Sequence, residues 1–470
     1  MDDKVSGTHD AVVLGAGLAG LAAERRLADA GRFVTVVERG AVAGGLARTV
    51  TVRGFRFDLG GHRFITDDPA IEAFVRDLLG SDCLSVPRSS RIMLGGKCFH
   101  YPLRPLNAIL GFGALTSARI LFDYACEQLR ARWRSTTPRS LEDWVVRNFG
   151  RRLFEIYFRD YSEKVWGIDS RHIAMQWVAQ RVQGLSLGRA IRHAMLPAPW
   201  PRLHTLADRF LYPAQGIGQI AQRLVGSMGS RARLLNDTSV VRIEHRDNHI
   251  TGAVVRRAGY EQRLVGEHFI SSIPLQALIA TLSPPAPAPV RAAAAGLRSR
   301  DLVLVTLMLD RARATGHTWI YFPEPQVPFG RIHEPTNWST QMAPSGKTAL
   351  VAEHFCFRGD GTWGSSNEAL VQRTRQWLAR LGFIDPAEVI DAEVVRVPNA
   401  YPLFEVGYET RCQCICDYLA RFDNLHLTGR GGKFRYYNMD QAIGSGMQAA
   451  QAVLDAPLPA YLHLDTVQTR

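Results

Sequence analysis

Three glycines near the start of the chain have the spacing of a loop that holds phosphate groups. Gly15, Gly17 and Gly20 follow a short apolar run and precede a segment rich in Ala and Leu. In such a loop the first glycine permits a tight turn, the second lets the backbone approach a pyrophosphate, and the third allows close packing of helix on strand. The helix that begins here would offer unpaired N–H groups and a partial positive charge. The spacing therefore predicts a dinucleotide-binding loop.

An acidic residue stands where a ribose would be bound. Glu38 follows a second β-branched run, 33–37. Its carboxylate can accept hydrogen bonds from a ribose diol, and its negative charge disfavours a 2′-phosphate at that place. The glycine loop alone does not distinguish NAD from FAD. A second flexible loop, with Gly44, Gly45 and Arg48, comes soon after Glu38 and can wrap the middle of a long dinucleotide.

The order of the expected elements indicates a discontinuous α/β fold. The run 11–14, the helix 18–30 and the run 33–37 form a βαβ unit. The other expected elements are a strand at 50–57, a helical region at 71–211, strands at 238–243, 250–256, 262–272 and 302–309, a linker at 283–289, a strand at 425–428 and a helix at 441–454. We therefore predict a nucleotide domain made from three separated pieces, with a substrate domain inserted twice.

Composition limits the class of protein. The chain has 470 residues, of which 46% are hydrophobic and 21% charged. This length fits two to four domains, and the composition excludes a disordered chain or a small disulfide scaffold. No apolar run long enough to cross a membrane is present, and Asp2, Asp3 and Lys4 stand where a secretion signal needs apolar residues. We expect a soluble, cytoplasmic protein without a transmembrane segment.

The net charge of +12 raises the question of an anionic partner. Only five of the 56 basic residues are lysines, and the arginines are spread along the chain without a recognition motif, which disfavours nucleic acid. A surface of solvated arginines, an anionic substrate and a peripheral membrane contact stay open as interpretations. The oligomeric state is not indicated.

The cysteines do not have the spacing of a metal site. Cys412, Cys414 and Cys416 alternate along one short stretch, which is not a CxxC pattern, and no second ligand pair accompanies them. We expect buried thiols and no metal ion.

The segment 36–48, VVERGAVAGGLAR, resembles the FAD signature of the flavoprotein group that includes amine oxidases, protoporphyrinogen oxidases, phytoene desaturases and UDP-galactopyranose mutases. Within this group, several stretches are most similar to the UDP-galactopyranose mutases. They are 60–62, 161–167, 329–334, 400–402, 429–430 and 436–440. The resemblance implies FAD as cofactor and an α/β fold, in which a discontinuous Rossmann-like FAD-binding domain of the GR2 type carries an inserted α+β substrate domain with a helical layer.

The domain boundaries follow from this comparison and from the expected elements. The FAD-binding domain is predicted at 9–75, 205–282 and 405–457, a helical cap at 76–204, a strand-rich substrate region at 283–404, and a C-terminal tail at 458–470.

The resemblance also implies roles for individual residues. The implied FAD-binding residues are Gly15, Gly17, Gly20, Glu38, Arg39, Gly45, Arg48, Gly60, Gly61, His62, Gly429, Arg430 and Met439. The implied substrate-binding residues are Tyr161, Trp166, Arg331, Tyr401, Tyr436 and Tyr437, and the implied catalytic set is His62, Arg331, Tyr401 and Tyr437. His62 would act by hydrogen bonding to the flavin ring, and Arg331 by pairing with a substrate diphosphate. A second phosphate-binding arginine is not placed, and Arg189 and Arg192 are candidates for it.

Each of these roles has a structural alternative. His62 could be merely structural, and Arg331 could form a salt bridge, for which Glu334 is the nearest partner in sequence. Aromatic residues such as Trp166, Tyr436 and Tyr437 belong to cores more often than to pockets, although an aromatic wall suits a uracil or a sugar face.

Two functions from different classes follow. The first is a flavin-dependent isomerase that interconverts the ring forms of a nucleotide-activated sugar through flavin N5, without net redox change. The second is an oxidoreductase of the amine-oxidase or protoporphyrinogen-oxidase kind, which removes hydride from a C–N or C–C unit. A non-enzymatic nucleotide-sensing protein is disfavoured, because it would leave the segment 429–430 without a role.

Overall fold

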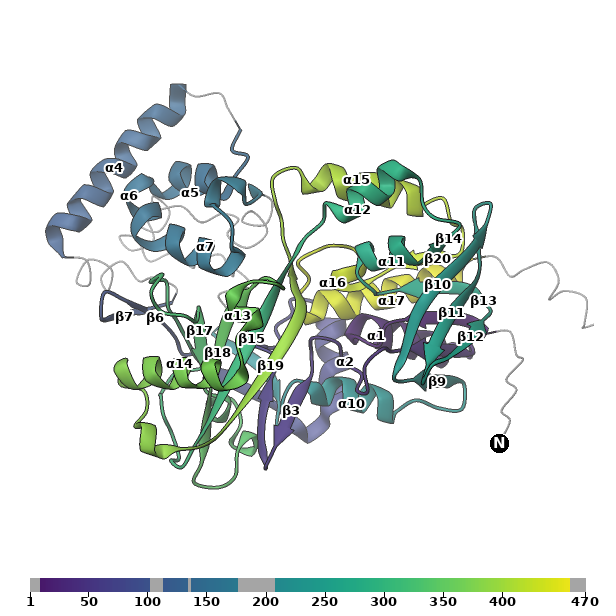
Figure 1. Cartoon of the computed structure of the whole chain (residues 1–470), viewed down its shortest axis with the longest axis horizontal. Coiled ribbons are helices and arrows are strands. Elements are labelled where there is room, and N and C mark those ends of the chain that lie inside the picture. Colours follow the sequence, from purple (N-terminus) through teal and green to yellow (C-terminus); the bar gives the residue numbers. More distant parts are fainter. Residues whose placement is uncertain (1–8, 102–112, 134–136, 176–207, 457–470) are drawn as a thin grey trace, which may run out of the picture. The chain divides into compact units, whose positions relative to one another are not determined.

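A computed structural model describes residues 9–101, 113–133, 137–175 and 208–456. The chain forms two compact units, shown in Figure 1. The first unit consists of Met1–Gly45, Ala221–Ala294 and Ile415–Arg470, and the second of Leu46–Ile220 and Ala295–Cys414. Neither unit is one continuous stretch, because the chain passes between them four times. The assignment of FAD binding and substrate binding to particular segments of the chain stays a prediction.

The first unit is built on a parallel sheet. Its strands, in spatial order, are β20 (Leu425–Leu427), β13 (Gly266–Ser271), β1 (His9–Leu14), β2 (Val34–Val37) and β9 (Ala232–Leu235). The predicted βαβ unit is confirmed, with α1 at Leu18–Asp29 between β1 and β2. Residues 11–14 are fully buried, as expected for a strand covered on both faces. The predicted C-terminal helix is also confirmed as α17 (Met439–Asp455), and α1 and α17 contact each other.

A second, four-stranded sheet belongs to the same unit. It consists of β12 (Tyr260–Leu264), β11 (His249–Arg257), β10 (Thr238–Arg246) and the short β14 (Leu282–Ser283). The prediction of one strand at 262–272 is wrong, because β12 ends at Leu264 and β13 belongs to the parallel sheet. At the break, a Cβ on Gly266 would lie 2.9 Å from a methyl carbon of Val12, so the chain needs a glycine there to approach β1.

The remaining helices near this unit are short. They are α10 (Gly218–Gly226), α11 (Leu275–Thr281), α12 (Ala288–Ala295), α15 (Tyr408–Leu419) and α16 (Gly429–Gly432). Part of the expected linker at 283–289 therefore belongs to a helix. Cys412, Cys414 and Cys416 lie on α15 and are only partly buried, and Cys98 is exposed, so the expectation of buried thiols holds only for Cys356.

The second unit is built on a seven-stranded mixed sheet. Its strands, in spatial order, are β19 (Val389–Pro402), β15 (Ser299–Leu309), β18 (Thr348–Cys356), β17 (Arg331–His333), β16 (Trp319–Tyr321), β6 (Ser90–Leu94) and β7 (Lys97–His100). All neighbours are antiparallel except β16 and β6.

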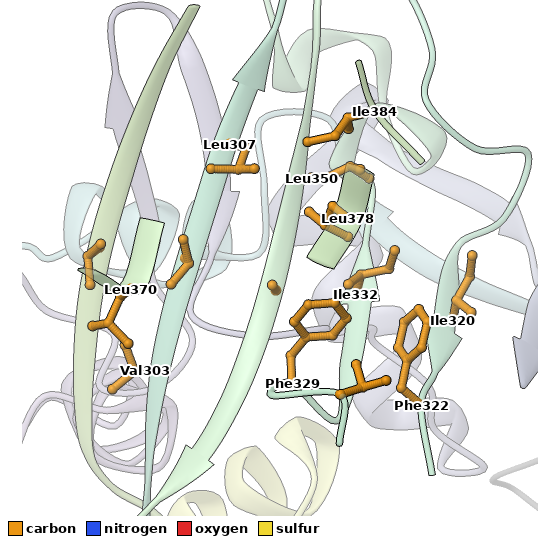
Figure 2. Packing of buried hydrophobic residues seen from close by; sticks show 14 of the residues in the cluster. Val303, Leu307, Ile320, Phe322, Phe329, Ile332, Leu350, Leu370, Leu378 and Ile384 are labelled. Carbon is orange, nitrogen blue, oxygen red and sulfur yellow. The ribbon is translucent and has the colours of Figure 1, made fainter. Parts of the chain in front are cut away.

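Both faces of β15 are buried, because alternate side chains enter two different clusters. Val303, Val305 and Leu307 pack with Leu370 and Leu378 of helix α14 (Asn367–Arg380). Figure 2 shows side chains of this cluster converging from β15, β16, β17, β18 and α14. On the other face, Leu302, Leu304 and Met308 pack against Phe55 and Phe57. The sheet thus lies between α14 and the hairpin of β3 (Thr49–Val52) and β4 (Phe55–Asp58).

This hairpin corrects the prediction of a single strand at 50–57. Arg53 and Gly54 both have positive φ, 48° and 85°, and so form a two-residue turn between β3 and β4. The same feature corrects the expected helical region at 71–211, where Gly95 and Gly96, with φ 60° and 71°, join β6 to β7. A glycine pair between two short apolar runs is typical of a β-hairpin. The prediction missed this hairpin because the surrounding sequence has helical periodicity.

The rest of that region is largely helical in its described parts. It contains α2 (Pro69–Leu79), α4 (Ala114–Trp133), α5 (Leu141–Phe149), α6 (Arg151–Leu153), a π-helical turn (Phe154–Phe158) and α7 (Arg159–Trp166), and also the strand pair β5 (Cys83–Pro87) and β8 (Arg209–Pro213). None of the described helices is long and apolar enough to cross a membrane.

Candidate functional site

The glycine loop of the first unit is closed so tightly that side chains do not fit. Gly15 has φ +102°, and a Cβ on it would lie 2.4 Å from the Ser272 hydroxyl oxygen. A Cβ on Gly20 would lie 2.0 Å from the Gly15 carbonyl oxygen. These two glycines therefore have the turn and packing roles expected from their spacing.

A second glycine loop lies against the first. Gly44 donates its N–H to the Ala16 carbonyl at 2.7 Å, and a Cβ on Gly45 would lie 3.2 Å from the Gly17 Cα. Gly17 is the N-cap of α1, and its backbone is extended with no side chain capping the helix. The N–H groups of the first turn are thus left for a ligand, and this cradle fits the pyrophosphate of a dinucleotide.

Glu38 joins the two ends of this cradle. Its carboxylate accepts N–H hydrogen bonds from Ala16 and Gly40, each at 2.9 Å. Each carboxylate oxygen can accept more than one hydrogen bond, so Glu38 can also accept a hydrogen bond from a ribose hydroxyl. Arg39, the next residue, is exposed.

The C-terminal segment of the first unit is fixed by Arg430. Its Nε and Nη2 donate to the Tyr437 carbonyl at 2.8 and 2.6 Å, and its guanidinium lies over the Tyr436 ring, 4.8 Å from the centroid. Gly429 precedes it with φ +73°. Asn438 then caps α17, whose first residue is Met439. The structure thus brings together Gly429, Arg430, Tyr436 and Met439 as one connected turn.

The glycine–histidine segment belongs to the second unit. Gly60 has φ +119°, and His62 donates its N–H to the Gly60 carbonyl at 2.7 Å. Gly61 donates its N–H to Oε1 of Glu353 at 2.9 Å. Arg48 is half-buried in the same unit, and its carbonyl accepts the Leu59 N–H at 3.2 Å. The loop expected to face the flavin ring is therefore held by a buried carboxylate.

A second buried carboxylate stands directly before this loop. Asp58 accepts hydrogen bonds from the hydroxyls of Thr49 and Tyr212, both at 2.6 Å, and from the Ile217 N–H at 3.0 Å. Burial raises the pKa of Asp58 to about 6, although these hydrogen bonds act in the opposite direction. Asp58 thus fixes the point at which β4 becomes the glycine–histidine loop.

Glu353 also binds Arg331. Oε2 accepts the Arg331 Nε–H at 2.6 Å, and Nδ1 of His333 lies 3.5 Å from Oε1. The Glu353 side chain has no exposed surface, which by itself would raise its pKa, but Arg331 and His333 lower the pKa to about 2. A carboxylate with these neighbours stays ionised and holds both Arg331 and the loop at Gly61.

Arg331 is fixed on two sides and open on a third. Its Nη2 donates to the Tyr401 hydroxyl at 2.8 Å, and its guanidinium lies over the Phe355 ring. The side chain remains 21% exposed. The two hydrogen bonds to Glu353 and Tyr401 use two of five N–H donors, so the guanidinium can still bind an anion.

The salt-bridge partner of Arg331 differs from the one suggested by sequence. Glu334 instead accepts N–H hydrogen bonds from Ala314 and Thr315, at 2.8 and 2.6 Å. Sequence reasoning missed Glu353, although it is a single carboxylate in the strand TALVAEHFC, where a buried charge needs a partner.

Tyr321, which pairs with Arg331 in the β16–β17 register, belongs to a cluster of aromatic rings. Tyr161 packs edge-on against Tyr321, with 5.6 Å between the ring centroids, and Tyr101 packs on the same ring at 5.0 Å. Trp166 contacts the Tyr401 ring at 6.5 Å and is only 2% exposed. Trp166 is therefore buried beside Tyr401, and its role in substrate binding stays a prediction.

Lys164 lies on α7 and is half-buried. Nζ of Lys164 donates to the carbonyls of Phe322 and Phe329, at 2.7 and 3.4 Å, and also to the Glu324 carbonyl. Burial lowers its pKa to about 8. Lys164 thus holds together the connection between β16 and β17, the strand on which Arg331 lies. Arg189 and Arg192 lie outside the described residues.

Known structures share this fold across nearly the whole chain. The structure of a reduced UDP-galactopyranose mutase matches with a TM-score of 0.80 and 22% identity, over 95% of this chain and 94% of that chain. The structure of a putrescine oxidase bound to putrescine matches with a TM-score of 0.67 and 16% identity, over 96% of this chain and all of that chain. These likenesses confirm the predicted α/β fold.

Curated relatives match over shorter stretches. The phytoene dehydrogenase of Streptomyces griseus is 52% identical over 63 residues, 13% of this chain and 12% of its own length. The Klebsiella pneumoniae protein named "Probable UDP-galactopyranose mutase" is 26% identical over 165 residues, 34% of this chain and 41% of its own length. The chain thus matches less than half of the length of either relative.

The family described as flavin containing amine oxidoreductase matches residues 18–454, which includes both glycine loops apart from Gly15 and Gly17. The chain therefore belongs to the flavin containing amine oxidoreductases, and its cofactor is FAD, as the resemblance implied.

Proposed function

We propose that this enzyme acts on a nucleotide-activated sugar and interconverts its ring forms without net oxidation. The observation that carries the proposal is the position of Arg331, whose guanidinium is fixed by Glu353 and Tyr401 and remains partly exposed. An immobilised guanidinium with free donors is suited to a diphosphate. The similarity to the Klebsiella pneumoniae protein supports the same substrate class.

The protein groups would bind and orient the substrate. Arg331 and the Tyr401 hydroxyl would hold phosphate oxygens, and the rings of Tyr161 and Tyr321 offer apolar faces for the base or the sugar. FAD, when bound and reduced, would supply a nucleophilic nitrogen, N5, for the anomeric carbon. His62, held in its loop by the Gly61–Glu353 hydrogen bond, is proposed to bind the flavin ring. Tyr436 and Tyr437 are proposed to bind the substrate, and Met439 to bind FAD.

A second candidate is an oxidoreductase that dehydrogenates a C–N or C–C unit. The family match over residues 18–454 favours it, as does the likeness to a phytoene dehydrogenase. In that case Arg331 and Glu353 would be a structural ion pair, and Tyr161, Tyr321 and Tyr101 would form an apolar wall.

One comparison of reactions separates the two. The purified yellow protein, reduced with dithionite under argon, is incubated with UDP-galactopyranose and the products are resolved by chromatography. Formation of the furanose form by reduced but not by oxidised enzyme supports the isomerase. Bleaching of the oxidised flavin by an amine or a polyene, with no ring interconversion, would reject it in favour of the oxidoreductase.

A further inference from the structure

Helix α4 presents a continuous apolar stripe to the outside of the second unit. Its large exposed apolar side chains are Leu115, Leu121, Phe122, Leu129 and Trp133. Phe122 is 73% exposed and Trp133 is 89% exposed, which is unusual for side chains of this size. Neither the FAD-binding loops nor the proposed substrate groups lie on this helix, so the stripe needs another explanation.

The stripe follows from the spacing of the residues. Leu115, Phe122 and Leu129 are seven residues apart, and the exposed Ala118 and Ala125 lie between them at helical spacing. Positions separated by three, four and seven residues share one face of a helix. Trp133, four residues after Leu129, continues this face at the C-terminal end of the helix.

The opposite side of α4 is attached to the protein. Asp123 accepts the Arg152 N–H at 2.8 Å, and the Gln128 side chain donates to the Arg147 carbonyl at 2.7 Å. Helix α4 contacts α5 and α6, and Figure 1 shows it along the outer side of these helices. The buried members of α4 are Ile120 and Glu127. Within the described part of the chain, the apolar stripe therefore lies on the side of α4 that is turned away from α5 and α6.

The exposed charged residues that border the apolar stripe are all positively charged. The exposed charged side chains of α4 are Arg119, Arg130 and Arg132. Its carboxylates point to the protein, since Glu127 is buried and pairs with Arg130 and Asp123 binds backbone. The exposed side of α4 is thus apolar with a cationic border and has no exposed carboxylate.

We propose that α4 binds the surface of a membrane that contains anionic lipids, with its axis in the plane of the membrane. Leu, Phe and Trp on one face with arginines beside them are the composition of helices that lie at this interface. Trp133 at the helix end is suited to the headgroup level. A second copy of the chain fits less well, because pairing two α4 stripes would bring Arg119 and Arg132 of both copies together, and α4 has no exposed carboxylate to place between them.

Vesicle flotation of the full flavoprotein tests this proposal. We expect the protein to float with vesicles of phosphatidylglycerol and phosphatidylcholine, and more weakly with pure phosphatidylcholine. The double variant Phe122→Ser/Leu129→Ser should lower the partition coefficient at least about tenfold, because two apolar side chains no longer enter the interface. Arg119→Gln should lower it about fivefold for the anionic vesicles only.

The matched control is Tyr260→Ser, which removes an aromatic side chain that is 83% exposed in the first unit. It should leave flotation unchanged, and the flavin spectrum should be the same in all variants. Absence of flotation, or flotation that Phe122→Ser/Leu129→Ser does not reduce, would overturn the proposal. So would a dimer in sedimentation analysis that this variant dissociates, without vesicle binding, since the stripe would then serve a second copy.

Discussion

Arg331 and Glu353 lie directly opposite each other on the antiparallel strands β17 and β18, and their side chains meet with 2.6 Å between Nε and Oε2. The same carboxylate accepts the Gly61 N–H through its other oxygen. One buried group therefore fixes both the arginine proposed to bind the substrate and the loop proposed to face the flavin. A substitution of Glu353 should therefore disturb both the position of Arg331 and the conformation of the loop at Gly61.

Replacing Glu353 with Gln should destabilise the protein strongly. The amide keeps the size of the side chain but leaves Arg331 as a mostly buried cation without its counter-ion, which costs about 3–5 kcal/mol of unfolding free energy. Chemical denaturation followed by fluorescence measures the change. The control is Glu72→Gln, which breaks the surface pair with Arg76 and should cost no more than about 0.5 kcal/mol. Equal effects of the two variants would contradict the role of Glu353.

Replacing Arg331 with Lys should weaken the binding of UDP while FAD stays bound. Lysine keeps the positive charge opposite Glu353 but lacks the planar fork, so about 1.5–3 kcal/mol of binding free energy should be lost. Titration calorimetry measures the affinity, and the visible spectrum reports on the flavin. An unchanged affinity for UDP would remove the diphosphate argument and favour the oxidoreductase.

The two buried carboxylates near the glycine–histidine loop should give opposite pH dependences of stability. The pKa of Asp58 is about 6 in the folded protein and 3.8 as its ordinary value, so its protonated form is favoured by folding. Its stabilising contribution, about 3 kcal/mol from this shift, is complete below pH 4 and lost as the pH rises through 6. The pKa of Glu353 is lowered from 4.5 to about 2, so its contribution is present above pH 4.5 and lost as the pH falls through 2.

The variant Asp58→Asn isolates the first of these contributions. Between pH 4 and 7 its unfolding free energy should depend less on pH than that of the unaltered protein, because the titrating group is gone. Denaturation curves at several pH values check this. A pH dependence identical to that of the unaltered protein would show that Asp58 has no raised pKa.

Replacing Gly45 with Ala should impair FAD binding. Gly45 has φ +59°, and the added Cβ would lie 3.2 Å from the Gly17 Cα, so the two glycine loops would have to separate. We expect an affinity loss of about 1–3 kcal/mol, measured as released flavin fluorescence. The control is Gly31→Ala, which has the same kind of backbone strain, with φ +83°, but no neighbouring atom within 4 Å. FAD loss in the control alone would contradict the argument.

The sequence predicted the first unit better than the second. The loop from Gly15 to Gly20 needs glycines for local steric reasons, so its spacing alone identifies the turn and the adjoining elements. The partner of Arg331 could not be found in this way, because Glu353 is 22 residues away along the chain and meets it only through strand pairing. The contacts of Lys164 could not be found from the sequence for the same reason, because this residue lies on α7 and Phe322, one of its carbonyl partners, is 158 residues away along the chain.

Pairing of strands that are distant in the sequence also delays folding of the parallel sheet during translation. Strand β20, at the edge of the parallel sheet, pairs with β13 and comes from residues 425–427. The amino-terminal half of the cofactor site thus leaves the ribosome long before the last strand of its own sheet exists. The parallel sheet of this unit cannot be completed during translation until residues 425–427 have emerged, and neither unit can be produced alone by simple truncation, because both are discontinuous in the sequence.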